Sequence, residues 1–198
     1  IIEDASTDSG TGRWTVIKIP TLSFYEYCQL LQLDDMPLLP DHLKITDIPK
    51  MENAEVADLM ARFEPLVKHF NRYLTIGGFP ELALSDDDLY AQRMLREDVV
   101  DKVIKRDVLT LFKVRSPLLM EKLFLYLCMN STEIFSATTA AKELDNISPN
   151  TIESYVDALV KSNLIYMAYP IAVGSKSVLK GRPKIYIADA AIRNAVLM

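Results

Sequence analysis

The chain has 198 residues, of which 49% are hydrophobic and 25% are charged. This length is enough for one sizeable domain or two small ones, and the hydrophobic fraction excludes an intrinsically disordered chain. The 22 basic and 27 acidic residues give a net charge of −5, so the whole chain lacks the cation excess typical of nucleic-acid-binding proteins. With no apolar run near the roughly 20 residues of a membrane span and no signal-peptide pattern, we expect a cytoplasmic protein that does not contact the membrane.

The first predicted element is a strand over residues 14–19, where aromatic and β-branched side chains precede Pro20. No convincing partner strand follows within the next hundred residues, so we expect this strand to complete a sheet that lies upstream. The preceding Gly10-Thr11-Gly12 loop lacks the lysine of a P-loop and leads into a strand instead of a helix. Residues 174–177 contain Lys-Ser but lack the upstream glycine and the following helix. We therefore expect no ATP hydrolysis and no cofactor in this chain itself.

A helical connector is predicted over residues 23–115. It begins with Ser23 and Glu26, whose spacing is that of a capping box at the start of a helix. Beyond it, apolar residues recur at steps of three and four, the spacing of amphipathic helices. The expected elements are a helix from 23 to about 33, an extended proline-containing segment over 34–50, a helix over 55–74 interrupted at Pro65, a tight glycine turn over 77–80 and a second long helix over 86–112.

A different pattern follows residue 115: three helices and then two strands, which is the order of a winged helix-turn-helix. The expected helices are 118–129, 136–144 and 149–163, and the expected strands are 164–169 and 184–188. The sequence thus predicts a mainly α fold, with a helical connector followed by a winged helix-turn-helix that has a small two-stranded wing. The expected domains are the end of an upstream core (1–22), the helical connector (23–115), the winged helix-turn-helix (116–190) and the start of a further C-terminal segment (191–198).

The third of these helices and the loop between the strands carry the candidate DNA contacts. The helix offers four polar side chains for phosphates or base edges: Ser148, Asn150, Thr151 and Ser154. Glu153 and Asp157 on the same helix would repel phosphates. Residues 171–185 hold four cations and no acid, as a DNA-contacting wing requires: Lys176, Lys180, Arg182 and Lys184. A solvated hairpin tip with ordinary surface charges is the alternative.

Residue types that carry catalysis are sparse. His42 and His69 lie in different predicted elements without a nucleophile spaced around them, so we interpret both as surface or packing residues. The acid run 86–88 starts a predicted helix and is interpreted as a partner of the helix dipole, not as a metal site. Cys28 and Cys128 have neither metal nor redox spacing and are expected to be reduced core thiols. We expect no catalytic residue and no metal site.

Four short motifs carry a family resemblance. They are Gly12-Arg13 before Ile17-Lys18-Ile19-Pro20-Thr21-Leu22-Ser23-Phe24-Tyr25-Glu26-Tyr27, then Tyr73-Leu74-x-x-Gly77-Gly78-Phe79-Pro80-Glu81, Arg106-Asp107-Val108, and Pro183-Lys184-Ile185-Tyr186-Ile187-Ala188-Asp189. In these motifs and their order, the chain resembles the C-terminal part of a large prokaryotic group of predicted AAA-superfamily P-loop ATPases that carry a C-terminal domain of unknown function. The group often has glycine after the aspartate, where this chain has Ala190-Ala191.

The resemblance implies that the strand over 14–19 is the last strand of an ATPase core. The Walker motifs, with ATP and Mg²⁺, would lie upstream in a longer parent protein, and a restriction-endonuclease-like segment would follow. Arg13 would then be positioned to sense nucleotide, since an arginine near the γ-phosphate stabilises the charge of phosphoryl transfer. The leading expectation is a non-catalytic DNA-binding and regulatory module, whose partners are the ATPase core and double-stranded DNA. The alternative is a protein–protein interaction or dimerisation module that uses the winged helix.

Overall fold

The structure is a computed structural model that describes residues 17, 19–33, 36–37, 40, 43–112, 114–171 and 181–197. Within these ranges the fold is mainly helical with a small two-stranded antiparallel sheet, which confirms the predicted class. Most of the strand expected over 14–19, together with Arg13, Lys176 and Lys180, lies outside the described residues. No helix in the described ranges is both long and apolar enough to cross a membrane.

The elements follow one another in nearly the expected order. The α-helices are α1 (Phe24–Leu30), α2 (Asn53–Phe63), α3 (Val67–Ile76), α4 (Pro80–Ala83), α5 (Asp88–Met94), α6 (Leu109–Leu111), α7 (Pro117–Met129), α8 (Ala137–Glu143), α9 (Pro149–Lys161) and α11 (Ala190–Leu197). Two short 3-10 helices, η1 (Ile45–Lys50) and η2 (Glu64–Leu66), flank α2, and two π-helical segments, η3 (Leu95–Asp101) and η4 (Val103–Val108), lie between α5 and α6. The strands are β1 (Ile165–Ala168) and β2 (Lys184–Ile187).

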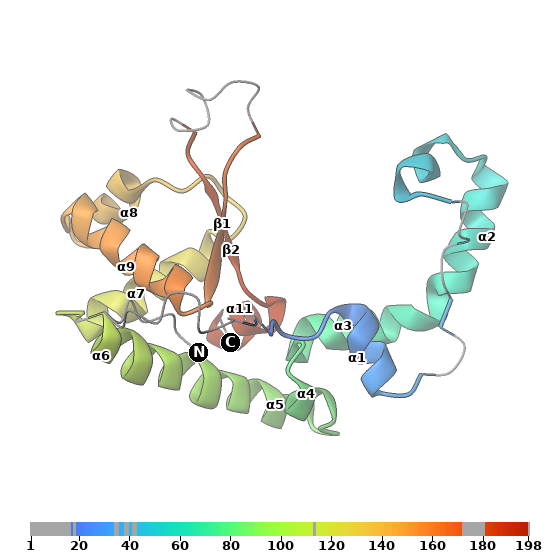
Figure 1. The fold of residues 1–198 in the computed structure, drawn as a ribbon, viewed down its shortest axis with the longest axis horizontal. Helices are drawn as coiled ribbons and strands as arrows, with labels where there is room; N and C mark the ends of the chain where they lie inside the picture. Colours follow the sequence, from blue (N-terminus) through green and yellow to red (C-terminus); the bar gives the residue numbers. More distant parts are fainter. Residues whose placement is uncertain are drawn as a thin grey trace.

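These elements form two groups (Figure 1). Helices α7, α8 and α9 gather around the β1–β2 hairpin, and the long helical stretch from α5 to α6 runs along this group. Helices α1, α3 and α4 lie near the α5 end of the stretch, and α2 projects away from the rest of the molecule. No residue of α2 is buried.

Helix α11 connects the two groups. It packs against α3, α7 and η3 and buries Ala191, Ile192 and Ala195. The Asn194 side chain donates a hydrogen bond to the carbonyl oxygen of Leu74 at 3.0 Å, at the C-terminal end of α3. Buried residues from α1 to α11 accordingly belong to one continuous hydrophobic core.

The stretch over 86–112 differs from the regular helix that its sequence predicts. Its middle is π-helical, and the buried residues Leu95 and Val100 stand five positions apart there. A π turn is wider than an α turn, so both side chains reach the same face. From Val100 the buried positions continue at steps of four, to Ile104 and Val108. The extra residue in the turn keeps the apolar face directed at the core.

The segment over 34–50 is also less extended than expected, because it ends in the 3-10 helix η1. The Asp47 carboxylate accepts a hydrogen bond from the backbone amide of Lys44 at 3.2 Å and closes the first turn of that helix. The break predicted at Pro65 is confirmed, since η2 separates α2 from α3 there. Proline lacks the amide hydrogen that a continuous helix would use.

The hairpin is antiparallel, and its central pairs are Tyr166–Tyr186 and Met167–Ile185. Ile165 and Ile185 are buried on the core side, whereas Tyr166 and Tyr186 are exposed on the opposite face. Residues 132–135 run along the other edge of β2: Thr132 N donates to the carbonyl oxygen of Ile185 at 2.7 Å. Strand β2 is therefore paired on both sides.

Candidate functional site

Helix α9 carries the polar residues that the sequence proposes for DNA. It begins at Pro149 after Ser148, the start predicted for it, although Ser148 makes no side-chain cap hydrogen bond. The apolar face of the helix is buried: Ile152, Tyr155, Val156, Ala158 and Leu159. Of the candidate contacts, Ser148, Asn150 and Ser154 are exposed, and Thr151 is half-buried.

Acids occupy the centre of the exposed face of α9. Glu153 and Asp157 are one turn apart, and Asn150 precedes Glu153 by three positions, so all three lie on one side of the helix. Asp157 pairs with Lys161, whose Nζ is 2.7 Å from the Asp157 carboxylate. The pair is exposed and adds little stability, but it uses the one cation on this face of α9 to balance an acid of the same helix.

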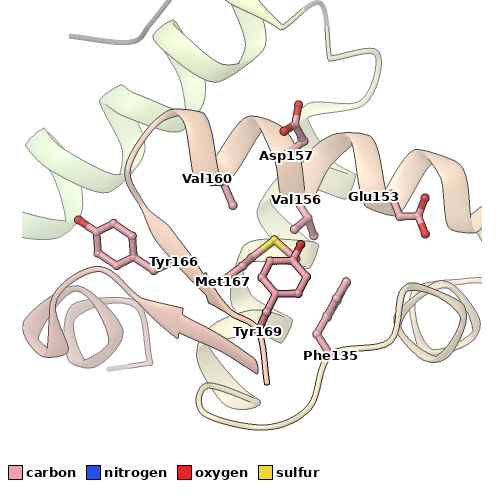
Figure 2. A pocket seen from close by; sticks show the side chains of 8 residues that line it. All are labelled: Phe135, Glu153, Val156, Asp157, Val160, Tyr166, Met167 and Tyr169. Carbon is pink, nitrogen blue, oxygen red and sulfur yellow. The ribbon is translucent and has the colours of Figure 1, made fainter. Parts of the chain in front are cut away.

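A groove of about 540 Å³ lies beside these acids, between α9 and the start of the hairpin loop. Its lining residues are Phe135, Glu153, Val156, Asp157, Val160, Tyr166, Met167 and Tyr169. In Figure 2 the side chains of Phe135, Val156, Met167 and Tyr169 lie close together, while Glu153 projects to one side of them and Asp157 points away from them on α9. Among the described residues that line it, two are acids and none is basic. The groove therefore combines an apolar floor with a negative rim.

The described wing cations lie apart from the groove. Lys184 is exposed and pairs in register with Ala168, on the hairpin face that also carries Tyr166 and Tyr186. Arg182 is exposed just before β2. Neither of these two cations is among the residues that line the groove.

Several other titratable groups of the described residues take part in helix capping and ion pairing. Asp87 Oδ1 accepts the amide of Tyr90 at 2.9 Å at the start of α5, and Asp88 pairs with Arg72 at 2.9 Å. The pKa of His69 is lowered by partial burial and by the nearby charges of Lys68 and Arg72. No group of three His, Cys, Asp or Glu side chains within the described ranges is arranged to hold a metal ion.

Three of the sequence motifs meet at one structural junction. The amide of Leu22 donates to the carbonyl oxygen of Gly78 at 2.7 Å, and the hydroxyl of Tyr73 donates to the carbonyl oxygen of Leu22 at 2.7 Å. The buried carboxylate of Asp189 accepts the amides of Gly78 at 3.0 Å and Ala191 at 2.9 Å. Within the described residues, no buried side-chain nitrogen or oxygen lacks a hydrogen-bond partner. These hydrogen bonds between the motifs secure the fold at the junction.

Sequence reasoning missed the groove. In the sequence, Glu153 and Asp157 stand out only as a difficulty for DNA binding, and no pattern distinguishes Phe135, Met167 and Tyr169. Tyr169 and Ile171 follow strand β1 and are exposed, with 56% and 102% of their surface accessible, a property that only the structure shows.

Comparison with known proteins identifies the family. The sequence model of a domain of unknown function, DUF8612, matches residues 67–198, and the chain belongs to this family. An uncharacterized protein of Haemophilus influenzae is 24% identical over 187 residues, which is 92% of this chain and 40% of that protein. An uncharacterized protein of Methanocaldococcus jannaschii is 25% identical over 153 residues, which is 74% of this chain and 34% of that protein. No solved structure matches the chain.

Proposed function

We propose that the chain is a non-catalytic interaction module of a longer AAA-superfamily P-loop ATPase, and that its C-terminal part is a winged helix that binds a protein partner. The ordered sequence motifs support the ATPase parent. The chain spans only about two-fifths or less of the two relatives, which leaves room for a nucleotide-binding core. ATP and Mg²⁺ would bind in that core, with Arg13 as the nucleotide-sensing residue. Sequencing the reading frame upstream of the chain tests the ATPase parent, and we expect it to encode Walker A and Walker B motifs.

The order and packing of the elements support the winged helix. Helix α7 is followed by the short paired segment 132–135, then by α8 and α9, which pack against each other, and then by the hairpin. Asp145 and Asn146 turn the chain between α8 and α9 with φ values of 65° and 56°. Asparagine and aspartate tolerate this left-handed region better than other residues with a side chain.

The observation that favours a protein partner is the acidic centre of the exposed α9 face. In a DNA-binding winged helix, the corresponding helix enters the major groove between two phosphate backbones. Glu153, which makes no ion pair within the described residues, would then approach phosphates, and a like-charge pair about 6 Å apart costs about 1–3 kcal/mol near a surface. Asp157 adds less repulsion because Lys161 balances its charge. A polypeptide has no fixed negative backbone and can fill the apolar floor of the groove.

Double-stranded DNA is the second candidate, because α9 exposes Asn150 and Ser154 and the hairpin carries Lys184. In that case the wing would neutralise phosphates, each contact adding about −0.9 to the slope of log affinity against log salt. Replacement of Lys176, Lys180 and Arg182 by alanine would then flatten the slope by about 2–3. Variants of Asn150 or Ser154 would leave the slope unchanged and alter only the preference among sequences.

Peptide selection tests the proposal. A library of random peptides displayed on phage is selected against the chain, and enriched peptides are measured by fluorescence anisotropy. Tyr169→Ala, which removes a groove side chain, should weaken binding at least about tenfold, a loss of about 1.4 kcal/mol. Tyr25→Ala, an equally large change at an exposed residue of α1, should leave affinity unchanged. Salt-sensitive binding of a short duplex without any groove-binding peptide would replace the protein partner with DNA.

A further inference from the structure

Strand β1 has one edge that no strand of the described residues pairs with. Ala188 N donates to the carbonyl oxygen of Leu164 at 3.0 Å, so residues 164 and 188 form a hydrogen-bonded pair at the end of the ladder. In an antiparallel ladder such pairs alternate, so Tyr166 and Ala168 exchange hydrogen bonds with β2. The amide and carbonyl of Met167 consequently point toward the other edge.

The partner strand β2 offers no such edge. The backbone of Ile185 is used on the far side, where its amide donates to the carbonyl oxygen of Glu133 at 3.4 Å and its carbonyl accepts the amide of Thr132 at 2.7 Å. The open edge of β1, in contrast, belongs to a strand that lines the groove, through Met167 and Tyr166. A segment paired with this edge would run along the groove.

We propose that the partner segment is an extended, basic polypeptide that adds to the open edge of β1 as a further antiparallel or parallel strand. This inference rests on the proposed function, since it specifies what the groove binds. Strand addition supplies main-chain hydrogen bonds for affinity, and pockets for alternate side chains supply selectivity. Met167 provides one amide and one carbonyl for these bonds, and Pro170 limits the pairing to a short stretch.

The groove defines the side chains of the segment. Side chains alternate between the two faces of a strand, so every second residue would point toward α9. One of these residues is apolar and enters the floor formed by Val156, Val160 and Met167. The next, two positions along, is lysine or arginine and lies opposite Glu153, which makes no ion pair within the described residues, and near Asp157, which is paired with Lys161. The negative rim selects a cation at this position and disfavours an acid.

Two measurements on the selected peptides test this inference. Enriched peptides should contain an apolar residue two positions from lysine or arginine, and Glu153→Lys with Asp157→Lys should weaken them at least about tenfold. Glu143→Lys, at an exposed glutamate of α8 outside the groove lining, is the matched control and should have no effect. N-methylation of every second backbone amide of the peptide should abolish binding, whereas N-methylation of the amides between them should not, because in a strand alternate amides face the same edge.

The outcomes separate this inference from the proposed function. If enriched peptides depend on Tyr169 but are acidic, helical when bound or insensitive to N-methylation, the groove binds protein in another way and strand addition is overturned. The same holds if the double charge reversal leaves affinity unchanged. If no enriched peptide depends on Tyr169, the proposed function itself fails. Strand addition is supported only if three results are all observed: a lysine or arginine in the enriched peptides, its spacing of two positions from an apolar residue, and the alternating effect of N-methylation.

Discussion

The backbone amide of Gly78 donates a hydrogen bond to Oδ2 of Asp189, 3.0 Å away and 111 residues later in the chain. The other oxygen of the same carboxylate accepts the amide of Ala191 at the start of α11. Gly78 also accepts the amide of Leu22, so one tight turn connects the segment before α1 with the segment after β2. The glycine turn and the aspartate motif, which are far apart in the sequence, form a single structural unit.

Asp189→Asn should destabilise the fold. One of the two oxygens becomes an amide nitrogen, which faces a backbone N–H and leaves a buried donor without an acceptor. Such a loss costs about 1–3 kcal/mol. The free energy of unfolding in urea measures it. Asp145→Asn is the control, since that side chain is 76% exposed and pairs only with Lys122. The control should change stability by less than about 0.5 kcal/mol, and an equal loss in both variants would contradict the assigned role.

Gly78→Ala should be destabilising through a steric clash. A Cβ atom at this position would lie 2.2 Å from the carbonyl oxygen of Leu22, a backbone atom held by the hydroxyl of Tyr73. Overpacking of this kind costs about 1–3 kcal/mol. Of the two glycines in this turn, only Gly77 has a positive φ, of 81°. Thermal melting that matches the exposed control Ser154→Ala would show that the turn can relax.

Arg72→Lys should loosen the connection between α3 and the turn before α5. The guanidinium donates to Asp88 Oδ1 at 2.9 Å, to the hydroxyl of Tyr27 at 2.9 Å and to the carbonyl oxygen of Ala83 at 3.0 Å, and it also contacts the carbonyl of Ser85. Lysine cannot span these acceptors with a single ammonium. A loss of about 2 kcal/mol in urea unfolding is expected. Arg62→Lys on the exposed α2 is the control and should behave as wild type.

Cys128 should be unreactive in the folded chain. Burial raises the pKa of its thiol to about 12, because the thiolate is poorly solvated there. Iodoacetamide at pH 8 should therefore leave its mass unchanged in buffer and alkylate it in urea. The unfolded thiol ionises from about pH 8.5, whereas the folded thiol does not, so Cys128 contributes a stability that is complete below that pH and declines as pH rises toward 12. Rapid alkylation in buffer at pH 8 would contradict this.

Local chemistry made most elements predictable. The capping box is present: the Glu26 carboxylate accepts the amide of Ser23 at 2.8 Å, and the Ser23 hydroxyl accepts the amide of Glu26 at 3.3 Å. Pro149 lies in the first turn of α9, where its missing amide hydrogen costs nothing. These signals depend only on residues that are neighbours in the sequence, so they can be predicted without knowledge of the fold. The π turns after Leu95 are not, because they result from the position of the core against which that residue packs.

The groove could not be predicted for a related reason. Phe135 precedes α8, Val156 lies on α9 and Tyr169 follows β1, and only the packing of the helix on the sheet brings them together. The open edge of β1 depends equally on tertiary structure, since a strand pattern does not state how many neighbours the strand will have. The two acids of α9 were visible in the sequence, but their position along an apolar groove required the structure.

The distance of 111 residues between Gly78 and Asp189 also sets an order of events during synthesis of the chain. At about 5–20 residues per second, the ribosome makes Asp189 roughly 6–22 s after Gly78. Helix α3 is complete long before α11, which later covers part of it, has been translated. The nascent segment thus exposes apolar surface for many seconds, and chaperone binding is expected at α3 during translation.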